Sequence, residues 1–169
     1  MKQFTIAAML LGAVALSACD NSNRFGSDGM GAGAGGAAVP GSVDDPTSPA
    51  YFQATIGDRV LFLVDQSSLN PEAQAVLIKQ AEWLMSNPAF NATIEGHADE
   101  QGTREYNLAL GARRASAVQA FLIDRGVAPN RLKTVSFGKE RPLAICSEEA
   151  CYAQNRRAVT VLTAAGAGV

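Results

Sequence analysis

The sequence predicts an α/β fold, a two-layer sandwich in which two helices cover one face of a single sheet. Four short β-rich runs and two long segments with apolar residues at helical spacing follow one another in the order β-α-β-α-β-β. These elements lie within residues 51–164, a stretch long enough for one domain with a single core. The sequence therefore indicates one α/β domain, preceded by a segment of different composition.

The first strand and the first helix have clear start and stop signals. Residues 59–64, R-V-L-F-L-V, form a short β-rich run. Asn70 is suited to cap a helix whose first residue is Pro71, and Asn87-Pro88 ends the helical pattern. Between these signals the apolar side chains recur at helical spacing, at Ala73, Leu77, Ala81 and Leu84.

The second half of the domain repeats this alternation. Residues 90–96 alternate between apolar and polar side chains, as a half-buried strand does. A second helix is expected from about residue 103 to 125, with Gly126 ending it. Residues 132–137 and 158–163 are two further strand candidates, and residues 165–169 are expected to form a frayed tail.

The N-terminal segment has the features of a secreted, lipid-anchored protein. Residues 1–18 have the layout of a secretory signal peptide, and their apolar stretch is short for a transmembrane helix. Small residues directly before Cys19 indicate that this cysteine is lipid-modified; an ordinary signal peptide followed by an unmodified thiol is the alternative. Residues 19–50 are rich in Gly, Ala, Ser, Asp and Pro, which predicts a flexible tether.

Charge and cysteine content narrow the possible partners. The net charge is −2 and no basic block stands out, so the sequence does not indicate nucleic acid as a partner.

Cys146 and Cys151 lie five positions apart in a polar segment, and an oxidising compartment favours a disulfide between them. Reduced thiols are the alternative. A metal site is the weaker interpretation, because zinc sites usually need four ligands and the chain has one histidine. No cofactor is indicated.

The second helix carries an arginine on its apolar side. Its apolar stripe contains Tyr106, Leu110, Ala117, Val118 and Phe121, and Arg114 falls inside this stripe. A guanidinium there must either extend to solvent or find an anion. Asp99, in the turn before the helix, is one candidate partner, and a ligand carboxylate is another. Asp99 and Arg114 together would bind the amino-acid end of a zwitterionic ligand; the alternative is a structural ion pair without a ligand.

His97 raises the question of an enzyme. It lies close to Glu95, Asp99 and Glu100, so a metal-dependent amidase is conceivable. A catalytic zinc site normally takes three protein ligands with histidines prominent among them, and the chain has no G-x-S-x-G motif. We therefore expect no enzyme, and we interpret His97 as a structural donor in the turn.

Four longer segments carry specific sequence motifs. The most specific is E-G-H-A-D-E-Q-G-T-R-E-Y-N-L-A-L-G-A-R-R-A at residues 95–115. The others are D-Q-S-S-L-N-P-E-A at 65–73, S-F-G-K-E-R-P at 136–142 and A-Q-N-R-R-A-V at 153–159. These segments resemble the OmpA-like peptidoglycan-binding domain family, in particular its lipid-anchored members. The resemblance extends over residues 59–162 and includes the processing site before Cys19.

The resemblance implies non-covalent binding of the peptidoglycan stem peptide through its meso-diaminopimelate residue. By the family motif, the zwitterion of this residue is held by Asp99 and Arg114. Matching positions that line the pocket are Phe62, Leu63, Gln101 and Leu110, and Arg156, with its neighbours Asn155 and Arg157, frames the site. The family's partners are the propeller protein TolB and other Tol proteins, and its place is the outer membrane, with the domain in the periplasm and a role in cell division.

Three positions depart from the family pattern. Leu63 stands where relatives commonly have an acid, so a contact there must come from the backbone. Gln101 replaces an arginine that is common in relatives, which removes a positive charge near the pocket. Asp20 directly follows Cys19, and in enteric bacteria an aspartate there resembles a signal for retention in the inner membrane.

Overall fold

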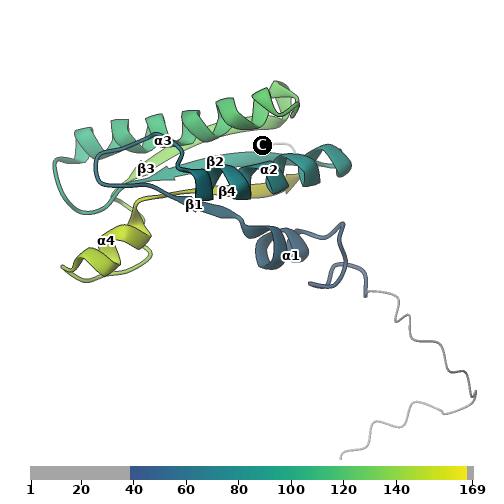
Figure 1. Ribbon diagram of the computed structural model, residues 1–169, viewed down its shortest axis with the longest axis horizontal. Coiled ribbons are helices and arrows are strands. Elements are labelled where there is room, and N and C mark those ends of the chain that lie inside the picture. Colours follow the sequence, from purple (N-terminus) through teal and green to yellow (C-terminus); the bar gives the residue numbers. More distant parts are fainter. Residues whose placement is uncertain (1–38, 167–169) are drawn as a thin grey trace, which may run out of the picture. The chain divides into compact units, whose positions relative to one another are not determined.

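One mixed four-stranded sheet forms the centre of the fold (Figure 1). The computed structural model describes residues 39–166, so the predicted signal peptide, Cys19 and most of the predicted tether lie outside the described residues. The strands are β1 (Arg59–Leu61), β2 (Phe90–His97), β3 (Leu132–Gly138) and β4 (Arg157–Ala164). Their spatial order is β1-β4-β2-β3, with β4 antiparallel to β1 and β2, and β2 parallel to β3.

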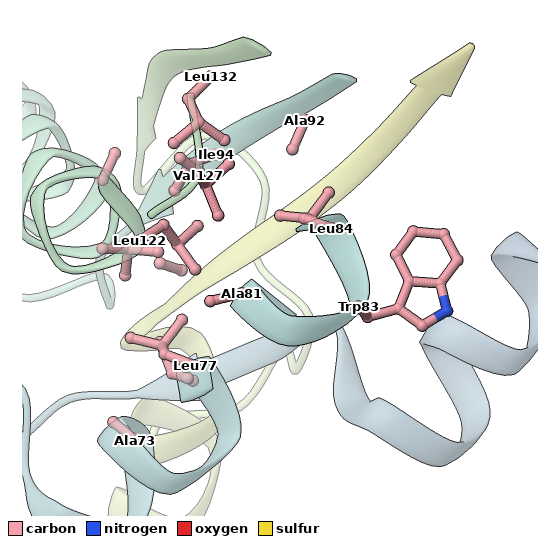
Figure 2. Close-up of a cluster of buried hydrophobic side chains, with 14 of the residues drawn as sticks. Ala73, Leu77, Ala81, Trp83, Leu84, Ala92, Ile94, Leu122, Val127 and Leu132 are labelled. Carbon is pink, nitrogen blue, oxygen red and sulfur yellow. The ribbon is translucent and has the colours of Figure 1, made fainter. Parts of the chain in front are cut away.

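Two long helices pack on one face of this sheet, as the sequence predicted. They are α2 (Pro71–Ser86) and α3 (Arg104–Asp124). Asn70 caps α2 by accepting a hydrogen bond from the Ala73 amide at 2.8 Å, and Thr103 caps α3 in the same way through the Tyr106 amide. The buried core joins both helices to all four strands, and Figure 2 shows it around Leu77, Leu84, Ile94, Leu122 and Leu132.

A close backbone contact sets the distance between α3 and the sheet. A Cβ atom on Gly96 of β2 would lie 1.8 Å from the carbonyl oxygen of Gly111 in α3, and one on Gly111 would lie 2.4 Å from Ser136 Oγ. Only glycine fits at both positions. Because Arg114 follows Gly111 by about one helical turn, this contact also brings the guanidinium of Arg114 to the end of the sheet.

Four short helical elements were not predicted. Ahead of β1 lie α1 (Pro49–Tyr51) and the π-helical turn η1 (Phe52–Gly57), and the Trp83 indole donates a hydrogen bond to the Pro46 carbonyl oxygen at 2.7 Å. Residues ahead of position 51, the expected start of the domain, thus already contact it. Helix α4 (Glu149–Asn155) lies within the cysteine-containing loop, and a 3₁₀ turn, η2 (Pro129–Arg131), leads into β3.

The first strand is shorter than the β-rich run of residues 59–64. The Phe62 amide still donates to the Arg156 carbonyl oxygen at 2.8 Å, but the chain then leaves the sheet and turns towards α3. None of the helices within the described residues is long and apolar enough to cross a membrane.

Candidate functional site

The turn after β2 carries Asp99 and is fixed from several sides. The Ala98 amide donates to the Gly138 carbonyl oxygen at 2.8 Å. The buried Asn107 amide group donates to the carbonyl oxygens of Asp99 and Gln101, at 3.2 and 2.8 Å. These bonds place the Asp99 carboxylate at the edge of the interior, with 8% of the residue exposed.

The carboxylate of Asp99 pairs with Arg156. Asp99 Oδ2 lies 3.1 Å from Arg156 Nη1, and Asp99 Oδ1 accepts a hydrogen bond from the Gln101 amide at 3.2 Å. Arg156 also donates to the Phe62 carbonyl oxygen and to both carboxylate oxygens of Glu149. Burial alone would lower the pKa of Arg156, but the hydrogen bonds with Glu149 and Asp99 outweigh it and raise the pKa. Asp99 is thus held beside a permanently charged guanidinium.

Arg114 is fully buried and binds backbone carbonyl groups. Its Nη1 donates to the His97 carbonyl oxygen at 2.8 Å, its Nε to that of Gln66 at 2.8 Å, and its Nη2 to that of Leu63 at 3.1 Å. The guanidinium carbon lies 5.2 Å from the centre of the Phe62 ring. Burial lowers the pKa of Arg114 to about 10, against the opposing effect of the Asp99 charge. The side chain therefore remains charged at neutral pH.

These contacts rule out one of the two alternatives that the sequence left open for Asp99 and Arg114, a direct ion pair between them. Within residues 39–166 Asp99 pairs with Arg156, and the zwitterion site stays a prediction. Arg114 neither extends to solvent nor meets a carboxylate, because carbonyl oxygens satisfy its guanidinium. Arg114 thereby holds the segment of residues 62–66 against the end of the sheet.

The other predicted site residues surround this group in different ways. The Leu63 side chain is 58% exposed while its carbonyl group faces Arg114, as expected for a backbone contact at this position. Gln101 is exposed, and Leu110 is buried in the interior at 3% exposure. Phe62 is buried, with its ring beside Arg114 and its carbonyl group bound by Arg156.

The segment that covers Arg114 has one unusual backbone position. Asp65 has a φ of +56°, a left-handed conformation that non-glycine residues seldom adopt. Its carboxylate accepts a hydrogen bond from the Tyr106 hydroxyl at 3.2 Å. The segment is therefore held by α3 at two points, Arg114 and Tyr106.

His97 does not act as the structural donor that the sequence suggested. The residue is 2% exposed, its ring stacks on Phe137 at 5.5 Å between centres, and neither ring nitrogen has a hydrogen-bond partner within the described residues. Burial, together with the charges of Arg157 and Arg141, lowers its pKa to about 4. His97 is thus neutral at pH 7. In residues 39–166 there is no group of three metal-ligating side chains.

The cysteine loop supports the site from the side of β4. Cys146 and Cys151 form the predicted disulfide, with their Cα atoms 5.9 Å apart. Cys151 lies in α4, which also carries Glu149. The buried Asn155 binds Glu100 through its amide nitrogen, at 3.1 Å, and the amides of Leu143 and Ala144 through its oxygen. Asn155 thus links the turn after β2 to the loop of residues 143–144, and its role beside a ligand stays a prediction.

Two residues of the site were missed by the sequence analysis. Asn107 fixes the Asp99 turn, and Glu149 shares Arg156 with Asp99. Asn107 lies seven positions before Arg114 on the same helix, so its place in the buried stripe was an available signal. Glu149 had no such signal, because an acid in an exposed polar loop is ordinary.

Comparison with known proteins shows relatives over most of the chain. Residues 61–156 match the OmpA family model. The chain is 51% identical over 154 residues to the peptidoglycan-associated lipoprotein of Rhizobium meliloti, and this alignment covers 90% of the chain and 84% of the relative. It is 41% identical over 153 residues to the protein of that name from Pseudomonas aeruginosa, with 86% of this chain and 90% of the relative covered.

Solved structures agree with the sequence relatives. The crystal structure of the peptidoglycan-associated lipoprotein from Burkholderia pseudomallei superposes with a TM-score of 0.64 at 42% identity, covering 72% of this chain and 98% of that one. The C-terminal domain of Helicobacter pylori MotB has a TM-score of 0.60 at 22% identity, over 64% of this chain and 86% of that one. The second likeness shows the fold alone.

Proposed function

The chain belongs to the OmpA family and, within it, to the peptidoglycan-associated lipoproteins, and from this we propose that it binds the peptidoglycan stem peptide at Asp99. One observation supports the proposal most directly. A nearly buried carboxylate lies at the end of β2, hydrogen-bonded to Arg156 and within the field of Arg114. A ligand with an ammonium group and a carboxylate group matches this arrangement of charges.

The ammonium group of diaminopimelate binds the Asp99 carboxylate. Asp99 has four lone-pair positions and uses two of them, for Arg156 and for the Gln101 amide. An ammonium group can therefore bind without displacing either partner.

The carboxylate of the ligand binds Arg114 when residues 62–66 move aside. In the structure Leu63 and Gln66 direct carbonyl groups at Arg114, and these acceptors carry no net charge. A carboxylate forms stronger, charge-assisted bonds in the same positions. The departure at Leu63 is compatible with this mechanism, because only the backbone of Leu63 faces the guanidinium.

The proposed role is a non-enzymatic attachment of the outer membrane to the cell wall. Lipid on Cys19 anchors the chain, and the predicted tether within residues 19–50 gives the domain its reach into the periplasm. TolB and the other Tol proteins are the proposed protein partners in envelope integrity and division. Exposed apolar side chains beside the site, Leu63 at 58% and Val64 at 49%, favour TolB binding at an overlapping surface.

Co-sedimentation of the full chain with isolated sacculi tests the proposal. Sacculi with diaminopimelate in the stem should carry the protein into the pellet. Sacculi with lysine at that position keep an amino group but lack the second carboxylate, so they should bind clearly less. Equal binding to both types would contradict a zwitterion site, and no binding to either would leave the TolB surface as the function. Addition of excess TolB should release bound protein, whereas simultaneous saturable binding of both partners would contradict an overlapping surface.

A further inference from the structure

A second polar site lies at the other end of the sheet. A cavity of about 160 Å³ opens there, and its polar lining consists of Asn91, Thr93, Asn130, Arg131, Lys133 and Thr163. Asn91 is near the start of β2, whereas the Asp99 turn follows the end of that strand. The eight residues of β2 span about 25 Å at roughly 3.3 Å per residue. The cavity is thus separate from the Asp99 site.

The strand register brings four of these side chains to one face. Asn91 pairs with Thr163, and Thr93 pairs with Lys133. The alternate residues of β2, Ala92 and Ile94, are buried beneath the helices. Because successive side chains of a strand point to opposite faces, Asn91 and Thr93 lie on the face that α2 and α3 leave open.

The cavity is lined by two cations and, among residues 39–166, by no acidic side chain. Arg131 donates to the carbonyl oxygens of Leu84, Asn87 and Phe90, and it forms no ion pair within the described residues. Lys133 is exposed and likewise forms no ion pair in that part of the chain. The amide and hydroxyl groups around the two cations supply hydrogen-bond donors.

We propose that this cavity binds a small oxyanion, a phosphate or a carboxylate group. An oxyanion would supply the counter-charge to Lys133 and accept hydrogen bonds from the surrounding side chains. The site does not depend on stem-peptide binding at Asp99. Two sources carry this chemistry: the phosphate of a phospholipid headgroup and the carboxylates of the cell wall.

The position of the cavity makes the phospholipid headgroup worth testing. Arg131 binds carbonyl groups at the end of α2, and Trp83 in the same turn binds the carbonyl group of Pro46. The N-terminal segment of the described chain therefore packs on the end of the domain that holds the cavity. Because the predicted lipid anchor, Cys19, precedes that segment in the chain, the phosphate of a phospholipid is the first source to test.

Titration of the ¹⁵N-labelled full chain with inorganic phosphate, in a nonionic detergent, tests the site. We expect saturable shifts of the Thr93, Lys133 and Thr163 amide signals, and no such shifts with chloride at the same ionic strength. Lys133→Ala should weaken phosphate binding about fivefold, as expected for the loss of about 1 kcal/mol from one exposed charge contact. Lys79→Ala, which makes the same charge change on the exposed surface of α2, should leave the binding constant unchanged.

Shifts that are absent, that chloride reproduces, or that Lys133→Ala leaves intact would overturn the site. Flotation with phosphatidylglycerol vesicles and sedimentation with sacculi then separate the two sources. If Lys133→Ala reduces flotation alone, the anion is a lipid phosphate. If it reduces sedimentation alone, and does so in an Asp99→Asn background as well, the anion is a wall carboxylate. If it reduces neither, the cavity has no oxyanion in the envelope and the proposal fails.

Discussion

Asp99→Asn is the substitution that separates ligand binding from folding at the proposed site. The amide keeps the shape of the carboxylate and keeps an oxygen to accept the Gln101 amide, but it carries no charge for an ammonium group. A hydrogen bond to a charged partner contributes about 1.5–3 kcal/mol. Its loss therefore predicts a roughly 10- to 150-fold weaker affinity for diaminopimelate-type sacculi.

The same substitution should leave the fold intact. Arg156 loses the 3.1 Å pair with Asp99 but retains Glu149 and the Phe62 carbonyl oxygen. Removing one partner of a buried pair costs about 3–5 kcal/mol when the remaining charge is left alone. Because Arg156 keeps two other acceptors, we expect a loss of only about 1–2 kcal/mol in the free energy of unfolding.

Quantitative sedimentation and urea unfolding of the same samples measure both effects. Asp124→Asn makes the same charge change at the other end of α3 and is the matched control. Wild-type affinity in a folded Asp99→Asn protein would refute the role of Asp99 as the ammonium receptor. Unfolding of the variant would instead refute the argument that Glu149 and Phe62 compensate Arg156.

Three further predictions concern the framework of the site. Gly111→Ala places a methyl group 2.4 Å from Ser136 Oγ and should lower the free energy of unfolding by about 1–3 kcal/mol. Urea unfolding measures this loss, and an unchanged urea midpoint would contradict the close contact. His97 has a pKa of about 4 in the folded chain and about 6.5 when unfolded, so its contribution to stability is present above pH 6.5 and is lost as pH falls towards 4. His97→Phe should therefore flatten the stability profile between pH 4 and 6.5, and a difference between the two proteins that does not vary with pH would contradict the buried neutral imidazole. Replacing Cys146 and Cys151 by serine opens a loop with a sequence separation of 5 and should lower the free energy of unfolding by about 2 kcal/mol. Hydrogen exchange should become faster mainly in α4, and unchanged exchange there would show that the disulfide does not stabilise this helix.

Local chemistry explains why the main elements could be predicted. Helix α2 begins at Pro71 and ends at Ser86 because Asn70 caps it and Asn87-Pro88 stops it, and each of these signals acts within a few residues in the sequence. Helix α4 could not be found in this way. Its seven residues include no capping side chain, and it is held instead by the disulfide and by the contact of Glu149 with Arg156.

Arg114 shows the same limit at the site itself. Helical spacing correctly predicted a guanidinium inside the apolar stripe, and the structure buries it fully. Its partners could not be predicted, because the three acceptors are backbone carbonyl groups, and any residue supplies one. Spacing alone therefore left Asp99 as one candidate partner of Arg114, whereas in the structure Asp99 pairs with Arg156. The contacts of Arg114 also have a consequence for the proposed function: a ligand carboxylate could reach Arg114 only if residues 62–66 moved, so the proposed binding would be coupled to the conformation of that segment.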